Sequence, residues 1–213
     1  MKIFMSSLVI TLAVTVAVFF GVRKLEASDP HVVTSSATAC VKAHPGPPYI
    51  GVAAVPFSGL TAFGHMTETR PNLHVIYRSF GTPLSSAEVG PDIACGVLPL
   101  IQLNPYNISL SAIAAGDYDS YLERYAAAIH LLGTRIALSF APEANGTWYS
   151  WGCHHTASEV YVAAWRHMHD VMSRAGTNNI LWVWDANHIF PGACPLAERW
   201  PGNQYVDWIA VDG

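Results

Sequence analysis

The sequence predicts an α/β fold, a (β/α)8 TIM barrel that is incomplete, with about six βα units present. Three observations lead to this prediction. Short, continuous apolar runs alternate with helical segments along the chain, and six such runs begin at intervals of roughly thirty residues, the size of one βα repeat. The turn after the first run, residues 55–59, also lacks the glycine-rich phosphate loop that a doubly wound sheet usually carries. The barrel is therefore preferred to the doubly wound sheet.

The six predicted strands are continuous and rich in Val, Ile, Leu or aromatic residues, as strands buried on both faces of a parallel sheet are. They cover residues 49–55, 74–80, 97–103, 135–140, 180–184 and 208–211. Two helices between them are clear. Asp117 can cap a helix that Gly133 closes, and Thr156 with Glu159 can form a capping box for a second helix that Gly176 ends.

The N-terminus predicts export. Lys2 precedes an uncharged stretch, residues 3–22, which fits either a cleaved signal peptide or a retained membrane anchor. We therefore expect a signal or anchor over residues 1–27, a linker over 28–48 and a partial catalytic domain over 49–213, in a protein that is secreted or anchored at the cell surface.

The composition and the cysteines exclude some classes of partner and cofactor. A net charge of −4 offers no basic surface, so nucleic acid is not an expected partner. Four cysteines in an exported chain predict disulfides, with three possible pairings. Metal binding through Cys153-His154-His155 is the alternative, but three consecutive side chains rarely converge on one ion. We expect no metal and no cofactor.

The segment most informative about chemistry is residues 140–152, Phe-Ala-Pro-Glu-Ala-Asn-Gly-Thr-Trp-Tyr-Ser-Trp-Gly. It follows the fourth predicted strand, so it lies on the rim where barrel active sites are found. Glu143 is a single carboxyl group among apolar and aromatic residues, an environment that favours the protonated form and suits a general acid. A glutamate that only caps a loop is the alternative.

This segment resembles the signature of glycoside hydrolase family 26, His-Glu-Met-Asn-Gly-x-Trp-Tyr/Phe-x-Trp-Gly. Residues 161–170, 176–187 and 201–213 are similar to the helix and strands that follow it in the family, so the resemblance covers residues from about 115 to 213. It implies a β-mannanase-like barrel that cleaves β-1,4-mannan, or less often mixed-linkage glucan or xylan, with retention. A polysaccharide is the expected partner.

The family's residues carry over one by one. Glu143 aligns with the proton donor and Trp148 with an aromatic that lines the sugar site. Pro142 and Ala144 replace the family's His and Met, which leaves substrate choice open. We also expect five nearby residues to bind substrate: Tyr149, Trp151, Asn145, Trp184 and Asn187.

The second carboxylate is the main departure from the family. The nucleophile of the family is a Glu at the end of the seventh strand, a position that would lie beyond Gly213. Asp185 and Asp212 also end predicted strands on the rim, and strand spacing puts Asp212 about 9–10 Å from Glu143. That separation could suit the base of an inverting enzyme, but loop-capping roles are the simpler interpretation. An inactive carbohydrate-binding remnant of the same fold is the alternative to an enzyme.

The barrel also predicts the cysteine pairing. Cys153 follows the fourth strand and Cys194 the fifth, so both lie in adjacent rim loops, whereas Cys40 and Cys95 lie toward the opposite end. We expect the pairs Cys153–Cys194 and Cys40–Cys95. His188, just past the fifth strand, is a further candidate for sugar contact.

Overall fold

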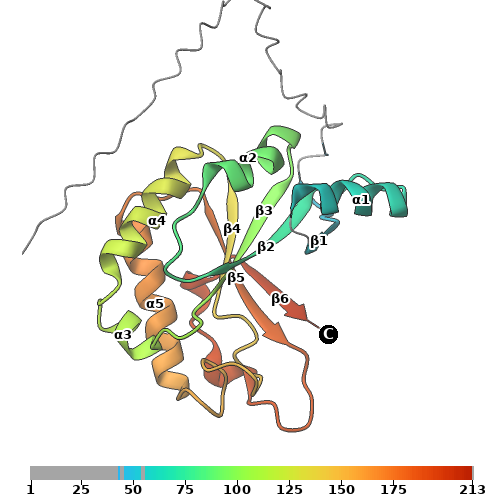
Figure 1. Ribbon diagram of the computed structural model, residues 1–213. Helices are drawn as coiled ribbons and strands as arrows, with labels where there is room; N and C mark the ends of the chain where they lie inside the picture. Colours follow the sequence, from blue (N-terminus) through green and yellow to red (C-terminus); the bar gives the residue numbers. More distant parts are fainter. Residues whose placement is uncertain (1–42, 44–45, 54–55, 213) are drawn as a thin grey trace, which may run out of the picture. The chain divides into compact units, whose positions relative to one another are not determined.

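The computed structural model describes residues 43, 46–53 and 56–212. They form one sheet of six parallel strands that lie in the order of the sequence (Figure 1). The strands are β1 (Gly51–Ala53), β2 (Leu73–Ser79), β3 (Leu98–Asn104), β4 (Ile136–Phe140), β5 (Ile180–Asn187) and β6 (Trp208–Asp212). Parallel strands in chain order, joined by helical connections, form a barrel wall. The predicted fold, an incomplete (β/α)8 barrel, is confirmed.

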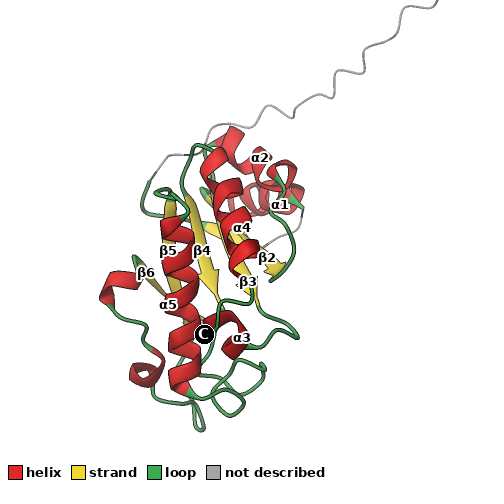
Figure 2. Ribbon diagram, turned by 90° about the vertical axis from the view of Figure 1, so that its left-hand side faces the viewer, coloured by secondary structure: helices red, strands yellow, loops and turns green. Residues whose placement is uncertain are grey.

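Helical segments connect each pair of neighbouring strands. They are α1 (Phe57–Thr67), α2 (Ser86–Cys95), α3 (Leu110–Ala114), α4 (Asp119–Leu131), α5 (Ser158–Arg174) and the short 3-10 turns η1 (Leu196–Arg199) and η2 (Asn203–Tyr205). Figure 2 shows α4 and α5 lying in front of the strands, so these helices cover one face of the sheet. Among the described helices, none has the length and apolar character needed to cross a bilayer.

The main core fills the space between the sheet and α4 and α5. Trp165 and Met168 of α5 and Leu138 of β4 have no exposed surface, and they belong to the same buried cluster. The Trp165 indole N–H donates to the Phe140 carbonyl oxygen at 3.2 Å, so the buried ring has a partner for its polar atom. This packing fixes the end of β4, the strand that leads into the 140–152 segment.

Two predicted caps are wrong. The N-cap of α4 is Tyr118 instead of Asp117, and the N-cap of α5 is Ala157, with no capping side chain at either helix. The Thr156 hydroxyl donates to the Ser150 carbonyl oxygen at 2.8 Å, so the predicted capping box is absent. The Thr156 hydroxyl binds a carbonyl group of the loop before the helix instead of the helix N-terminus, because buried carbonyl groups in a loop also need hydrogen-bond donors.

The amino-terminal strands have a separate small core. Leu60 of α1 packs with Cys95 and Val97 in a second buried cluster, and a buried pair joins His74 Nδ1 to Asp92 Oδ1 at 2.9 Å. The predicted signal or anchor (1–27) and most of the predicted linker (28–48) lie outside the described residues. So does Cys40, although its predicted partner Cys95 is disulfide-bonded.

Candidate active site

A cavity of about 360 Å³ opens at the carboxyl ends of the strands. Its lining comes from the ends of β2, β3 and β6 and from the loops that follow β3 and β4: Tyr77, Gln102, Asn104, Tyr106, Glu143, Tyr149 and Asp212. This is the rim at which barrel proteins bind and transform their ligands. Glu143 therefore lies at the predicted end of the barrel and faces the cavity.

The backbone that presents Glu143 is unusual. Ala141 has φ 46° and Glu143 has φ 54°, the left-handed region that non-glycine residues rarely adopt. Two hydrogen bonds hold the turn: Ala141 N–H donates to the Leu103 carbonyl oxygen at 3.1 Å, and Glu143 N–H donates to the Asp185 carbonyl oxygen at 2.8 Å. Such backbone conformations persist where the surrounding structure enforces them, and they cluster at functional sites.

The Glu143 carboxyl group is held by two donors from different loops. The Trp148 indole N–H donates to Oε2 at 3.0 Å, and Asn187 Nδ2 donates to Oε1 at 2.5 Å. Each oxygen therefore has one directed partner, which fixes the plane of the carboxyl group. A fixed carboxyl group facing a cavity is the geometry that general acid–base catalysis requires.

Two further carboxyl groups lie close to Glu143. Asp212 lines the same cavity, and burial together with the charge of Glu143 and a hydrogen bond to it raises the pKa of Asp212. The expected separation of about 9–10 Å is therefore wrong as a distance between the carboxyl groups. The expected value was the distance between strand backbones, and the side chains of Asp212 and Glu143 point toward each other across that distance.

Asp185 lies inside the sheet beneath this pair. It is 5% exposed, and Gln102 Nε2 donates to its Oδ2 at 2.6 Å. Burial raises the pKa of Asp185 to about 7, with a smaller contribution from the charge of Asp212, while the Gln102 hydrogen bond acts in the opposite direction. Asp185 thus keeps a proton close to neutral pH.

Three tyrosines line the cavity together with Glu143. Tyr77 and Tyr106 are about half exposed, and Tyr149 is partly buried. Burial and the charge of Glu143 raise the pKa of Tyr149 to about 12, so its hydroxyl keeps its proton. The wall therefore offers both ring faces and hydroxyl groups to a ligand.

The predicted substrate-binding residues divide into two groups. Tyr149 lines the cavity, whereas Trp148 and Asn187 contact the Glu143 carboxyl group directly without lining it. Trp151, Trp184 and Asn145 are at least 95% buried, and none lines the cavity. Residues buried in this way offer no surface to a ligand, so the structure does not support the predicted direct contact of these three residues with substrate.

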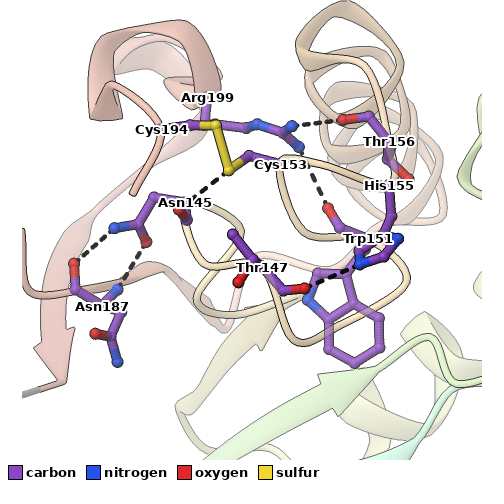
Figure 3. Close-up of a disulfide and its surroundings, with 9 residues drawn as sticks. All are labelled: Asn145, Thr147, Trp151, Cys153, His155, Thr156, Asn187, Cys194 and Arg199. Atoms are coloured by element: carbon purple, nitrogen blue, oxygen red, sulfur yellow. Dashed lines mark hydrogen bonds between the residues drawn. A yellow bond between two sulfur atoms is a disulfide. The ribbon is translucent and has the colours of Figure 1, made fainter. Parts of the chain in front are cut away.

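The contacts of two of these buried residues show what they position. The Trp151 ring stacks on Tyr149 with centroids 4.3 Å apart, and its N–H donates to the Pro142 carbonyl oxygen at 2.8 Å. The Asn145 amide makes two hydrogen bonds to the main chain of Asn187, both 2.9 Å long (Figure 3). Trp151 supports the cavity wall, and Asn145 fixes the residue that contacts Glu143.

A disulfide joins the same two loops. Cys153 and Cys194 are bonded, with Cα atoms 6.0 Å apart, as predicted. Cys194 N–H donates to the Asn145 carbonyl oxygen at 3.0 Å, and Cys153 Sγ lies 3.3 Å from the same oxygen (Figure 3). In this bond neither sulfur is available as a thiolate ligand.

Sequence reasoning missed Arg199, Gln102, Asn104 and both tyrosines at positions 77 and 106. Arg199 is 2% exposed and donates to the carbonyl oxygens of Trp151 and Thr156, so it fastens the loop after β4 (Figure 3). Gln102 and Asn104 carried a usable signal, since they are polar residues at the end of an otherwise apolar strand.

The fold and the cavity define a parallel barrel with a carboxyl-containing site at its strand ends, and comparison with known proteins gives the family. Residues 112–213 match the family model of glycosyl hydrolase family 26. Endoglucanase H of Acetivibrio thermocellus is 32% identical over 124 residues, which cover 55% of this chain and 14% of that protein. A mannan endo-1,4-beta-mannosidase of Bifidobacterium adolescentis is 30% identical over 84 residues, 38% of this chain and 8% of that protein.

Solved structures share the fold. The β-mannanase from a symbiotic protist of the termite Reticulitermes speratus, complexed with gluco-manno-oligosaccharide, superposes with a TM-score of 0.58 at 17% identity. The superposition covers 78% of this chain and 63% of that one. Residues 112–213 therefore match part of a glycosyl hydrolase family 26 domain, as the motif implied, and the chain spans only a small part of the curated relatives it matches.

Proposed function

We propose that the protein containing this chain is a glycoside hydrolase that cleaves β-1,4-mannan or a related β-glycan, with Glu143 as the proton donor. The observation that carries the proposal is the Glu143 carboxyl group, fixed by Trp148 and Asn187 and open to a cavity walled by tyrosines. Family membership supports the reaction class, and the relatives named for endoglucanase and mannosidase activity support a β-glycan as substrate.

In this mechanism Glu143 protonates the glycosidic oxygen as the bond to the leaving sugar breaks, and later takes a proton from the attacking water. Retention requires a second carboxylate about 5–5.5 Å away as nucleophile. Within the described residues, Asp185 is buried and Asp212 lines the cavity beside Glu143. The nucleophile of glycoside hydrolase family 26, which the motif resembles, is a Glu at the end of the seventh strand, and we propose the same position for it in the longer protein.

The protein is expected outside the cytoplasm, secreted or anchored at the cell surface. The disulfide that joins the two active-site loops supports this, because such bonds persist in oxidising compartments.

The experiment is an assay of the complete protein on mannan, mixed-linkage β-glucan and xylan, with the anomeric form of the first product followed by NMR. We expect cleavage of at least one of them with retention, and a loss of about 100-fold or more in Glu143→Gln. Glu123→Gln, a neutralised exposed acid on α4, is the matched control and should keep full activity. No cleavage of any glycan, or equal activity of the two variants, would refute the assignment.

A further inference from the structure

One polar side chain that lines the cavity has no role in the function proposed above. Gln102 is 7% exposed, and it lines the same cavity as Glu143. Its neighbours Ile101 and Leu103 leave β3 on the opposite face and belong to the apolar core. A buried amide group must find hydrogen-bond partners, which an apolar side chain at the same position would not need. The partners of this amide therefore show what Gln102 can bind.

The Gln102 amide is held in one orientation by Asp185. Gln102 Nε2 donates to Asp185 Oδ2 at 2.6 Å, and Asp185 is 5% exposed, so water hardly competes for this contact. The two residues lie on β3 and β5, which are separated in the sheet by β4. With Nε2 turned toward Asp185, Gln102 Oε1 accepts no hydrogen bond from the part of the chain that the structure describes. This oxygen is an acceptor that a ligand in the cavity can use.

The rest of the cavity lining favours an uncharged ligand with many hydroxyl groups. Glu143 and Asp212 contribute carboxyl oxygens, and the three tyrosines contribute hydroxyl groups. None of the described residues that line the cavity is Lys, Arg or His. A carboxylate or sulfate group on the ligand would therefore meet negative charge and acceptor oxygens without a cation to neutralise it. A neutral sugar ring instead offers hydroxyl donors to these oxygens.

We propose that Gln102 is a specificity-determining residue whose Oε1 accepts a hydrogen bond from one hydroxyl group of the sugar at the cleaved linkage. Asp185 is the positioning residue that turns the amide for this contact. A site built to bind a hydroxyl group rejects an analogue that lacks it, because the buried polar atom is then left unpaired. The inference rests on the proposed function, since the ligand is the substrate sugar beside Glu143.

The test is steady-state kinetics of the complete protein on the dinitrophenyl β-glycosides of mannobiose, cellobiose and xylobiose. The glycoside that is cleaved best is then compared with its monodeoxy analogues, each lacking one hydroxyl group of the sugar at the cleaved linkage. If Gln102 binds one of these hydroxyl groups, kcat/KM of the parent should fall about tenfold or more on the analogue that lacks it.

Gln102→Met keeps the length of the side chain and removes the amide. This variant should lose about tenfold in kcat/KM on the intact glycoside and less than about twofold on the analogue that the parent rejects, so the discrimination disappears. Asp185→Leu should also abolish the discrimination, and Asp185→Asn, which keeps an oxygen for Gln102 Nε2, should restore it. Gln204→Met, the same exchange at an exposed position of η2, is the control and should discriminate as the parent does.

The outcomes separate the two claims. A parent that cleaves the glycosides, together with a Gln102→Met variant that still discriminates as Gln204→Met does, would overturn the sugar contact and leave the hydrolase intact. An equal loss on the intact glycoside and on every analogue would also overturn it, because Gln102 would then support the fold without binding one hydroxyl group. If Gln102→Met does not fold, Asp185→Leu decides in the same way. A parent that cleaves none of the three glycosides would refute the proposed function and the sugar contact with it.

Discussion

The loops after β4 and β5 differ sharply from the ends of β2 and β3, although the loop after β4 and both of these strand ends contribute to the cavity lining. The first pair is cross-linked by the Asn145 amide, by a disulfide and by the buried Arg199. The ends of β2 and β3 present Tyr77, within β2, and Tyr106, just after β3, each about half exposed. The family match begins at residue 112 and so covers only the first pair. The proposed chemistry therefore lies on the rigid side of the cavity, and the other side supplies surface for the ligand.

The largest expected effect tests the buried acid on the rigid side. Asp185→Asn keeps an oxygen that can accept from Gln102 Nε2 but cannot ionise. In the unfolded parent this carboxyl group ionises at a pKa near 3.8, and in the folded protein at about 7. Between these two pKa values the folded parent keeps the proton on Asp185, whereas the unfolded parent has released it. The free energy of unfolding of the parent therefore falls as the pH rises. Relative to the parent, the variant should gain about 4 kcal/mol of unfolding free energy between about pH 4 and pH 8.

Urea unfolding at several pH values measures this difference. Glu123→Gln, which neutralises an exposed acid on α4, serves as the control and should show no such trend. A stability difference between Asp185→Asn and the parent that is the same at every pH would contradict the buried, protonated state of Asp185.

Removal of the rim disulfide tests the cross-linking itself. The bond closes a segment with a sequence separation of 41 residues, and replacing Cys153 and Cys194 by Ala should cost about 4 kcal/mol of stability. Chemical denaturation of the oxidised parent and the double variant gives the value. A change below about 1 kcal/mol would mean that the hydrogen bonds of Asn145 alone hold the two loops.

The amino-terminal side gives the contrasting prediction. Asp92→Ala leaves the buried His74 without the acceptor that lies 2.9 Å from its Nδ1, at a cost of about 2 kcal/mol. Turnover per folded molecule should not change, because this pair lies away from the cavity lining. Thermal unfolding gives the fraction of folded protein, and turnover is divided by the active-site concentration. If activity fell by more than the folded fraction, the amino-terminal core and the cavity would be coupled.

The smallest effect concerns the orientation of Glu143. Asn187→Ala removes the donor 2.5 Å from Oε1 and leaves the Trp148 donor in place. We expect kcat/KM to fall about tenfold, as for the loss of one hydrogen bond to a charged group. The melting temperature should change no more than it does in Ile189→Ala, the control variant for an exposed side chain. An unchanged kcat/KM would leave Trp148 as the only orienting partner.

The sequence predicted the six strands because each is a continuous apolar run, and it predicted the Cys153–Cys194 pair because both residues follow neighbouring strands. It did not separate Trp148 from Trp151, since residues in an irregular loop have no periodicity that shows which side chain is buried. It also misjudged Asp212, because backbone spacing gives no account of where side chains point. The αL conformation of Glu143 is likewise a consequence of the tertiary hydrogen bond to Asp185.

The leaving-group dependence of Glu143→Gln tests the central claim most directly. If Glu143 donates the proton, the complete variant protein should lose about 100-fold or more in kcat/KM on mannan. It should stay within a few-fold of the parent on a dinitrophenyl mannoside, whose leaving group departs without protonation. A similar loss on both substrates would show that Glu143 binds the sugar or supports the fold instead of acting as the acid.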